Sequence, residues 1–294
     1  MSAQQQGNIA GPSDKEAFAF VQALALEMSA GKIEIPSFPD VAVRIRKVLA
    51  DENCDTGQIA KVVSAEPAMA AKLLQMANSA ALNPNGARIT ELKTAIARIG
   101  FSNVRTTSLA YAMQQIQNAP ALAAIRRPLN DLWERSVKVA AMAFVVARRW
   151  TKLNADQALL AGLMHGMGRV YILTRAVKHP ALFADAAAYQ RIVQDWNTAI
   201  AKAVLESWEI APEIVRAVEQ YEDIEREGTG NPDLADILTI ANLLVSFHED
   251  PAALEIHLAA TTSSVRLGLD PEACRKALQE TAGELGSLRL ALGG

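Results

Sequence analysis

Apolar residues recur along this chain mainly at the spacing of three and four residues that is typical of amphipathic helices. No stretch keeps the alternation of apolar and polar residues that marks a half-buried strand over more than about four or five residues. Turn-forming residues interrupt the helical pattern roughly every 15 to 25 residues. The pattern therefore predicts an all-α protein made of two packed helical lobes.

The turn-forming residues also predict a domain organisation. Residues 1–13 are polar and contain glycine and proline, so we expect a disordered leader. A division near Ala119-Pro120 and Arg127-Pro128 separates an N-terminal helical lobe, residues 14–125, from a second lobe, residues 126–250. Residues 251–294 form a C-terminal helical extension that is rich in leucine, and the sequence leaves open whether it docks on the domain or serves as a partner helix.

Several helix starts and breaks can be read from single residues. Asp55 and Gln58 have the spacing of a capping box, and Pro67 suits the first turn of the following helix. The remaining signals are the N-cap candidates Thr90, Ser102 and Asn154, the breaks at Gly100 and Gly268, and Asp270-Pro271 at the start of a C-terminal helix. Asn78 is interpreted as a helix stop before Pro84.

Composition excludes several classes of protein. The chain has 294 residues, a net charge of −3 and a pI of about 5.9, so it has no overall positive field for nucleic acid or anionic lipid. It has only 2 cysteines, which argues against a disulfide framework and a cysteine-based zinc site. Its longest apolar stretch, Val137 to Val146, contains Lys138 and is shorter than the roughly 20 residues of a membrane span. We expect a cytoplasmic protein without membrane insertion, nucleic-acid partner or cofactor.

Three stretches of the first half carry a family resemblance. They are Ile35-Pro36-Ser37-Phe38-Pro39, the string Glu66-Pro67 to Leu73-Leu74 and Ala77-Asn78-Ser79-Ala80, and Ile89-Thr90-Glu91-Leu92 with Ala95 to Gly100 behind it. Together they resemble the HDOD domain, a helical bacterial signalling module related to the HD metal-dependent phosphohydrolases. The resemblance covers roughly residues 30–250, and it implies that the second lobe is an HD-phosphohydrolase-like helical bundle.

The resemblance also indicates where such enzymes keep their metal. The segment Ala161 to Arg169 resembles their histidine–aspartate helix, with Gly166 at the position of the aspartate. A lone histidine beside an arginine offers a divalent cation too few ligands, so the resemblance implies that the HD metal site is lost. The positions that would form this degenerate pocket are Arg135, His165, Gly166, Arg169, Asn197, Gln220, Tyr221 and Asn242.

The same segment has a purely structural interpretation. On one continuous helix His165 shares a face with the small residues Ala161, Gly162 and Gly168. Small residues favour the close approach of a neighbouring helix, so we expect a hydrogen-bonded histidine in the core.

Two further patterns are interpreted as non-functional. Residues 55–80 resemble a helix-turn-helix, but the second helix offers only Lys72 and Gln75 to a DNA groove. The acidic residues between Glu219 and Glu227 are expected to be solvated in an exposed loop that continues to Pro232.

The resemblance implies a non-catalytic regulatory module of bacterial signal transduction that docks other proteins. The implied partners are a sensor kinase, a response regulator or an enzyme of cyclic-dinucleotide turnover, bound in the crevice between the lobes or in the former metal pocket. One alternative is a nucleotide-binding sensor in which Arg135 and Arg169 contact phosphate. The other is a residual metal-dependent phosphohydrolase with an unrecognised ligand set.

Overall fold

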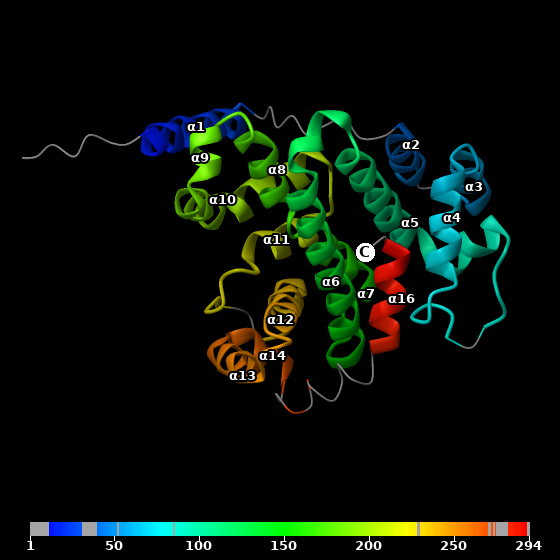
Figure 1. The fold of residues 1–294 in the computed structure, drawn as a ribbon. Coiled ribbons are helices and arrows are strands. Elements are labelled where there is room, and N and C mark those ends of the chain that lie inside the picture. Colours follow the sequence, from blue (N-terminus) through cyan, green and yellow to red (C-terminus); the bar gives the residue numbers. More distant parts are fainter. Residues whose placement is uncertain are drawn as a thin grey trace, which may run out of the picture.

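A computed structural model describes residues 12–30, 40–51, 53–84, 86–227, 230–269, 272, 274 and 282–292. Helices and turns account for the regular structure of these residues, and no strand occurs among them (Figure 1). The all-α prediction is therefore confirmed. The predicted leader at residues 1–11, the stretch Ile35–Pro39 and the predicted helix start at Asp270-Pro271 lie outside the described residues.

The first group of helices packs around the kinked helix α5. Its members are α2 (Asp40–Leu49), α3 (Thr56–Val63), α4 (Pro67–Ala77) and α5 (Leu92–Gln117). The Asp55 capping box is present, and Pro67 occupies the first turn of α4, as predicted. Gly100 has a φ of 73° and interrupts α5, which a residue without a side chain tolerates. The N-cap of α5 is Glu91, one residue after the predicted Thr90.

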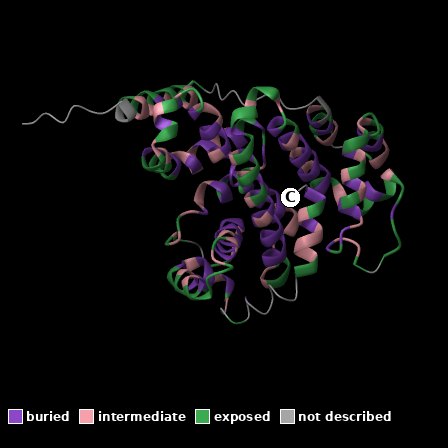
Figure 2. Ribbon diagram, in the orientation of Figure 1, coloured by how far each residue is buried: buried purple, intermediate pink, exposed green. Residues whose placement is uncertain are grey.

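The second group is built on the long, largely buried helix α6 (Arg126–Trp150), which follows a short 3-10 helix at Pro120–Ile125. The helices that follow it are α7 (Ala155–Met164), α8 (Met167–Ala176), α9 (Pro180–Ala184), α10 (Ala186–Ser207), α11 (Pro212–Gln220) and α12 (Leu234–Ser246). Asn154 caps α7, as predicted. Helices α7 and α12 pack on α6, while α10 packs on α8 and α11, and buried residues concentrate along these contacts (Figure 2).

The terminal helices pack far from their neighbours in sequence. Helix α1 (Pro12–Ser29) begins inside the range predicted as leader and contacts α9 and α10 of the second group. A carboxylate oxygen of Glu16 accepts hydrogen bonds from the backbone N–H groups of Ala181 and Leu182, at 3.0 and 3.2 Å. Helix α16 (Ala282–Leu292) instead contacts α4, α5 and α6. The C-terminal segment therefore docks on the domain, while the division into lobes at residue 125 stays a prediction.

A buried carboxylate holds the beginning of the C-terminal extension. Helices α13 (Pro251–Ala260) and α14 (Thr262–Leu267) follow α12, and α14 ends at Gly268 with a φ of 61°. Asp236 of α12 is fully buried and accepts hydrogen bonds from the side chains of Arg226, Ser263 and Arg266. This cluster ties the loop after α11 to α12 and α14.

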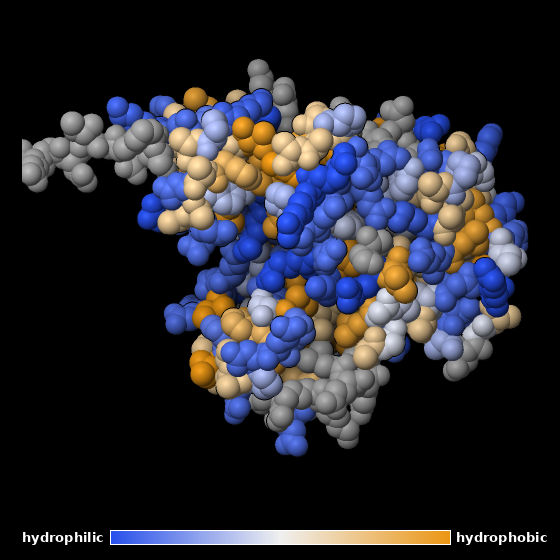
Figure 3. All heavy atoms as spheres, in the orientation of Figure 1, coloured by the Kyte–Doolittle hydropathy of each residue, from blue (hydrophilic) through white to orange (hydrophobic). Residues whose placement is uncertain are grey.

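The surface in the orientation of Figure 1 is mixed in character. Hydrophilic residues cover the centre of this face, and apolar residues lie in separate groups toward its sides (Figure 3). None of the helices in the described part of the chain combines the length and the apolar character that a bilayer crossing requires.

Candidate functional site

His165 lies at a corner between two helices. Helix α7 ends at Met164, His165 and Gly166 form the turn, and α8 begins at Met167. The prediction of one continuous helix is therefore wrong. Gly166, with φ −83° and ψ 1°, leaves the helical region of the backbone, in accord with the low helix propensity of glycine.

The imidazole of His165 is held inside the protein, which confirms the expected core histidine. The residue is 2% exposed, and its Nδ1 lies 2.6 Å from the carbonyl oxygen of Gly162. Burial lowers the pKa of His165 from 6.5 to about 3, against the hydrogen bond to Gly162, and the nearby guanidinium groups of Arg135 and Arg169 act in the same direction as burial. His165 is neutral at physiological pH.

The small residues around His165 permit close helix contacts, as predicted. A Cβ atom on Gly162 would lie 2.5 Å from the Cα of Ala140 in α6. A Cβ atom on Gly168 would lie 1.9 Å from the carbonyl oxygen of Asn197 in α10. On Gly166 it would lie 2.7 Å from Oγ of Ser136. The turn is thus wedged between α6 and α10.

A second set of predicted residues meets around a carboxylate. Oε1 of Glu222 accepts hydrogen bonds from Arg169 at 3.0 Å, Asn197 at 3.0 Å and the hydroxyl of Tyr221 at 2.7 Å. Tyr221 and Asn197 are buried, and the Arg169 and Glu222 side chains are about one third exposed. Burial, the charge of Glu222 and its hydrogen bond raise the pKa of Tyr221 above its ordinary value.

The guanidinium group of Arg135 donates hydrogen bonds to two side chains of α12. Its Nη2 donates to Oδ1 of Asn242 at 2.8 Å and to Oγ of Ser246 at 2.7 Å. Burial and the charge of Arg169 lower the pKa of Arg135, which remains a cation. This guanidinium therefore has protein acceptors on two successive turns of α12.

Gln220 does not join this cluster. Its Oε1 accepts a long hydrogen bond of 3.4 Å from Arg226, and it lines a different depression with Gln157 and Glu213. Of the eight predicted positions, the remaining seven lie at the His165 turn or in the two hydrogen-bonded sets beside it.

The donor set does not fit a divalent metal ion. Among the described residues no group of three or more His, Cys, Asp or Glu side chains is placed to hold a metal. The residues that meet here are instead a neutral histidine, two guanidinium groups and one carboxylate that is already hydrogen-bonded. Two cations beside the only carboxylate would repel a metal ion.

Glu222 is the main residue that the sequence analysis missed. We assigned it to a solvated acidic run, and this prediction is wrong at Glu222, because its side chain is only 29% exposed and accepts three hydrogen bonds. The signal that could have found it is its position directly after an aromatic residue at the end of an amphipathic helix, α11. The loop is further fixed by a hydrogen bond from the backbone N–H of Thr262 to the carbonyl oxygen of Ile224.

Solved structures share this arrangement of helices and define the class of the fold, an all-α domain. A protein from Shewanella amazonensis SB2B named "Putative metal-dependent phosphohydrolase" is 23% identical, with a TM-score of 0.76 over 95% of this chain and 99% of that one. An HDOD domain protein with unknown function from Geobacter sulfurreducens is 20% identical, with a TM-score of 0.63 over 92% of this chain and 96% of that one.

The chain belongs to the HDOD domain family, whose sequence profile matches residues 35–224. Two further relatives are longer than this chain, which covers only part of each. A "Putative signal transduction protein" from Marinobacter aquaeolei VT8 is 20% identical, with a TM-score of 0.59 over 97% of this chain and 67% of that one. An uncharacterized protein of Treponema pallidum (strain Nichols) is 21% identical over 73% of this chain, which spans only 42% of that relative.

Proposed function

We propose that this protein is a non-catalytic regulatory module that acts by docking signalling proteins. The observation that supports the proposal is that side chains of this chain bond to one another in the pocket where the resemblance implies a metal site. Arg169 donates to Glu222 at 3.0 Å, and Arg135 donates to Asn242 at 2.8 Å. The resemblance implies that an HD enzyme has metal ligands at the positions of Arg135, Asn197 and Asn242. The name of the Marinobacter relative agrees with a role in signalling.

Loss of the metal site is tested by metal content and activity together. The purified full chain is incubated with Mn²⁺, desalted and measured by native mass spectrometry, and its hydrolysis of bis-p-nitrophenyl phosphate is followed in parallel. We expect the mass of the metal-free chain and no hydrolysis. A stoichiometric metal with activity that disappears in His165→Ala would instead support the residual phosphohydrolase.

A restored aspartate gives a sharper comparison. The Gly166→Asp variant supplies the missing carboxylate beside His165, but Arg135 and Arg169 remain. Because these cations still repel a metal, we expect Gly166→Asp to bind no Mn²⁺ and to remain inactive. Stoichiometric Mn²⁺ binding by this variant would contradict the argument that Arg135 and Arg169 also keep a metal out of the pocket.

Docking is tested with purified candidates rather than a lysate. Sensor kinases, response regulators and cyclic-dinucleotide enzymes from the source organism are titrated against the full chain by interferometry. Saturable one-to-one binding of a member of one class supports the proposal. Absence of binding across all three classes argues against it.

The nucleotide-sensor alternative rests on one specific observation in the same pocket. Nε of Arg169 and Oδ1 of Asn197 are buried without a hydrogen-bond partner among the described residues. The alternative predicts that Arg135→Gln together with Arg169→Gln abolishes nucleotide binding. The internal hydrogen bonds of both arginines count against it, because a phosphate would have to displace Glu222 and Asn242.

A further inference from the structure

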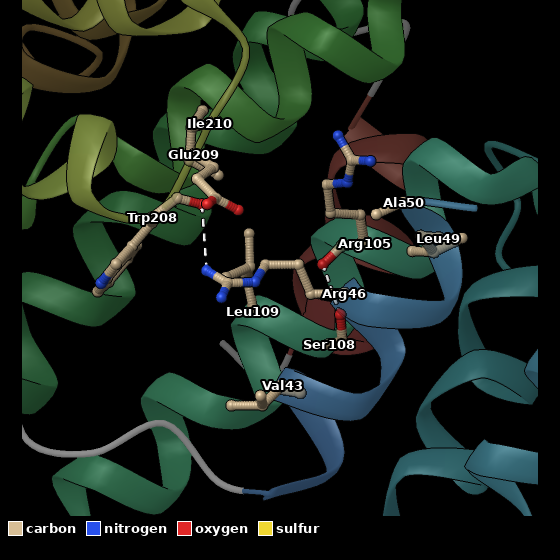
Figure 4. A pocket seen from close by; sticks show the side chains of 11 residues that line it. Val43, Arg46, Leu49, Ala50, Arg105, Ser108, Leu109, Trp208, Glu209 and Ile210 are labelled. Carbon is tan, nitrogen blue, oxygen red and sulfur yellow. Dashed lines mark hydrogen bonds between the residues drawn. The ribbon is translucent and has the colours of Figure 1, made fainter. Parts of the chain in front are cut away.

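A separate cavity of about 320 Å³ lies between the two groups of helices. Helices α2 and α5 form one wall, and the turn Trp208–Ile210 between α10 and α11 forms the other (Figure 4). Arg46 of α2 spans the gap with a long hydrogen bond of 3.5 Å to the carbonyl oxygen of Trp208, 162 residues away in the sequence. The volume falls at the lower end of the range of small-molecule sites.

The guanidinium groups of Arg46 and Arg105 line this cavity. Neither Arg46 nor Arg105 makes an ion pair with any described carboxylate, in contrast to Arg169 and Arg226. Arg105 is half-buried, and its guanidinium has no hydrogen-bond acceptor among the described residues. The two side chains point apart in Figure 4, so a ligand that contacts both requires a change of rotamer, which these long side chains permit. Two guanidinium groups favour a dianion with several acceptor oxygens over a single carboxylate.

The opposite wall presents a carboxylate on a strained turn. Glu209 has a φ of 54°, and it is the only described residue other than glycine with a positive φ. The backbone N–H of Ile210 donates to the carbonyl oxygen of Leu205 at 3.0 Å, which gives the helix end the pattern of a Schellman motif. Glycine is the usual residue at that position, so a glutamate there carries a local backbone cost.

The space between the charges is apolar. Ala42, Val43, Leu109 and Ile210 line it, and Arg46 extends beside Leu109 toward the carbonyl oxygen of Trp208 (Figure 4). A ligand that fits must therefore combine three features: a phosphate for the arginines, an apolar body for the walls, and N–H donors for Glu209. The internal contacts of Arg135 and Arg169 leave this cavity as the more open site for such an anion.

We infer that the cavity between α2, α5 and the α10–α11 turn binds a small organic phosphate with a planar body that carries N–H groups. The phosphate is bound by Arg46 and Arg105, and the N–H groups donate to Glu209. Because the ligand contacts both groups of helices, its binding fixes their relative position. This site is separate from the His165 cluster and does not depend on the proposed docking role.

The test is calorimetry on the full chain with guanosine 5′-monophosphate, whose base presents two adjacent N–H donors. Ribose 5-phosphate, guanosine and inorganic phosphate are the partial probes. We expect saturable one-to-one binding of the nucleotide and weaker binding of every partial probe by at least about tenfold. Absence of nucleotide binding at millimolar concentration overturns the inference. Inorganic phosphate binding as tightly as the nucleotide overturns the role of the organic body.

Matched variants separate the cavity from general surface charge. The double variant Arg46→Gln/Arg105→Gln is compared with Arg44→Gln/Arg98→Gln, which removes exposed arginines from the same two helices outside the cavity. We expect the first variant to weaken nucleotide binding at least about tenfold and the second by no more than about twofold. Equal effects of the two variants overturn the inference.

A third variant tests the opposite wall. Glu209→Gln keeps the shape of the side chain and removes its charge, so it should reduce the preference for the nucleotide over ribose 5-phosphate. An unchanged preference removes Glu209 from the site and overturns its assigned role. Circular dichroism and thermal unfolding confirm that each variant is folded before titration.

Discussion

The imidazole of His165 meets the ring of Tyr221 edge to face, with ring centroids 5.4 Å apart and ring planes at 89°. Tyr221 in turn donates its hydroxyl hydrogen to Glu222, which also accepts from Arg169 of α8 and Asn197 of α10. The contact therefore joins the α7–α8 turn to a polar network between three segments. It leaves His165 with an apolar ring on one side and a backbone carbonyl on the other.

This burial predicts a pH dependence of stability. The pKa of His165 in the folded protein is lowered from 6.5 to about 3, so between these values the unfolded chain binds a proton that the folded protein does not. The stability from neutral His165 is fully present above pH 6.5 and is lost as the pH falls toward 3. We expect the free energy of unfolding in urea to fall by about 2 kcal/mol between pH 7 and pH 5.

Two histidine variants isolate this effect. His165→Gln removes the titrating group, so its free energy of unfolding should depend much less on pH over the same interval. His248→Gln changes an exposed histidine and should keep the dependence of the unmodified protein. An equal pH dependence in His165→Gln and the unmodified protein would show that another group is responsible.

The buried pair of Asp236 and Arg266 predicts a large loss of stability. Burial alone would raise the pKa of Asp236, but hydrogen bonds from Arg266 and Ser263 and the charge of Arg226 hold it below its ordinary value. Asp236→Asn leaves Arg266, whose side chain is 10% exposed, without a carboxylate. We expect Asp236→Asn to lower the free energy of unfolding in urea by about 3–5 kcal/mol at pH 7.

A surface ion pair provides the control for Asp236. Glu219 accepts from Lys202 at 2.8 Å, and both side chains are more than one third exposed. Glu219→Gln should therefore change the free energy of unfolding by less than about 1 kcal/mol. A loss of similar size in the two variants would mean that the Asp236 cluster adds no more than a surface pair.

The sequence predicted local features better than long-range contacts. The helix starts at Asp55 and Asn154 and the burial of His165 depend on near neighbours, and all are confirmed. The packing of α1 on α9 and α10 depends on residues more than 140 positions apart, such as Glu16, which accepts from the backbone N–H of Ala181 in α9 at a separation of 165. Periodicity along the chain carries no information about such pairs.

The residues that the sequence analysis missed also depend on partners far away in the sequence. Glu222 was assigned to solvent because it stands in an acidic run, yet Arg169, 53 positions earlier, draws it into the site. Asp236 gave a signal that could have been used, because a carboxylate in the apolar segment Leu234–Leu244 must find a partner when it is buried. Its partner Arg266, 30 positions later, could not have been chosen from spacing alone.

The close contact of α8 and α10 predicts that Gly168 tolerates no side chain. A Cβ atom at this position would lie 1.9 Å from the carbonyl oxygen of Asn197 and 2.7 Å from its carbonyl carbon, so both helices would have to move. We expect Gly168→Ala to lower the free energy of unfolding by about 3 kcal/mol. Gly283→Ala in α16 meets no atom within 4 Å and should raise it by up to about 1 kcal/mol, and a stabilised Gly168→Ala would contradict the close contact.

Asn78 ends α4 as Asn118 ends α5, and we expect Asn78 to add more to the free energy of unfolding. Its Nδ2 donates to the carbonyl oxygens of Leu74 and Ile89, and its Oδ1 accepts from the backbone N–H of Ile89, each at 2.8 Å. Asn78 thus ends α4, as expected, and also fixes the chain before α5. We expect Asn78→Ala to lower the free energy of unfolding in urea by about 2–3 kcal/mol, because both backbone groups of the buried Ile89 lose their hydrogen bonds to this side chain.

Asn118 is the matched control for this prediction, because it also caps a helix and bonds to the carbonyl four residues earlier. Its Nδ2 donates to the carbonyl oxygen of Gln114 at 2.9 Å, but Asn118 is exposed, and its side chain bonds to no distant segment of the described chain. Asn118→Ala should therefore change the free energy of unfolding by less than about 0.5 kcal/mol. If both variants lose the same small amount, Asn78 acts only as a helix stop. A selective loss in Asn78→Ala assigns the added stability to the hydrogen bonds with Ile89, which join α4 to the segment before α5.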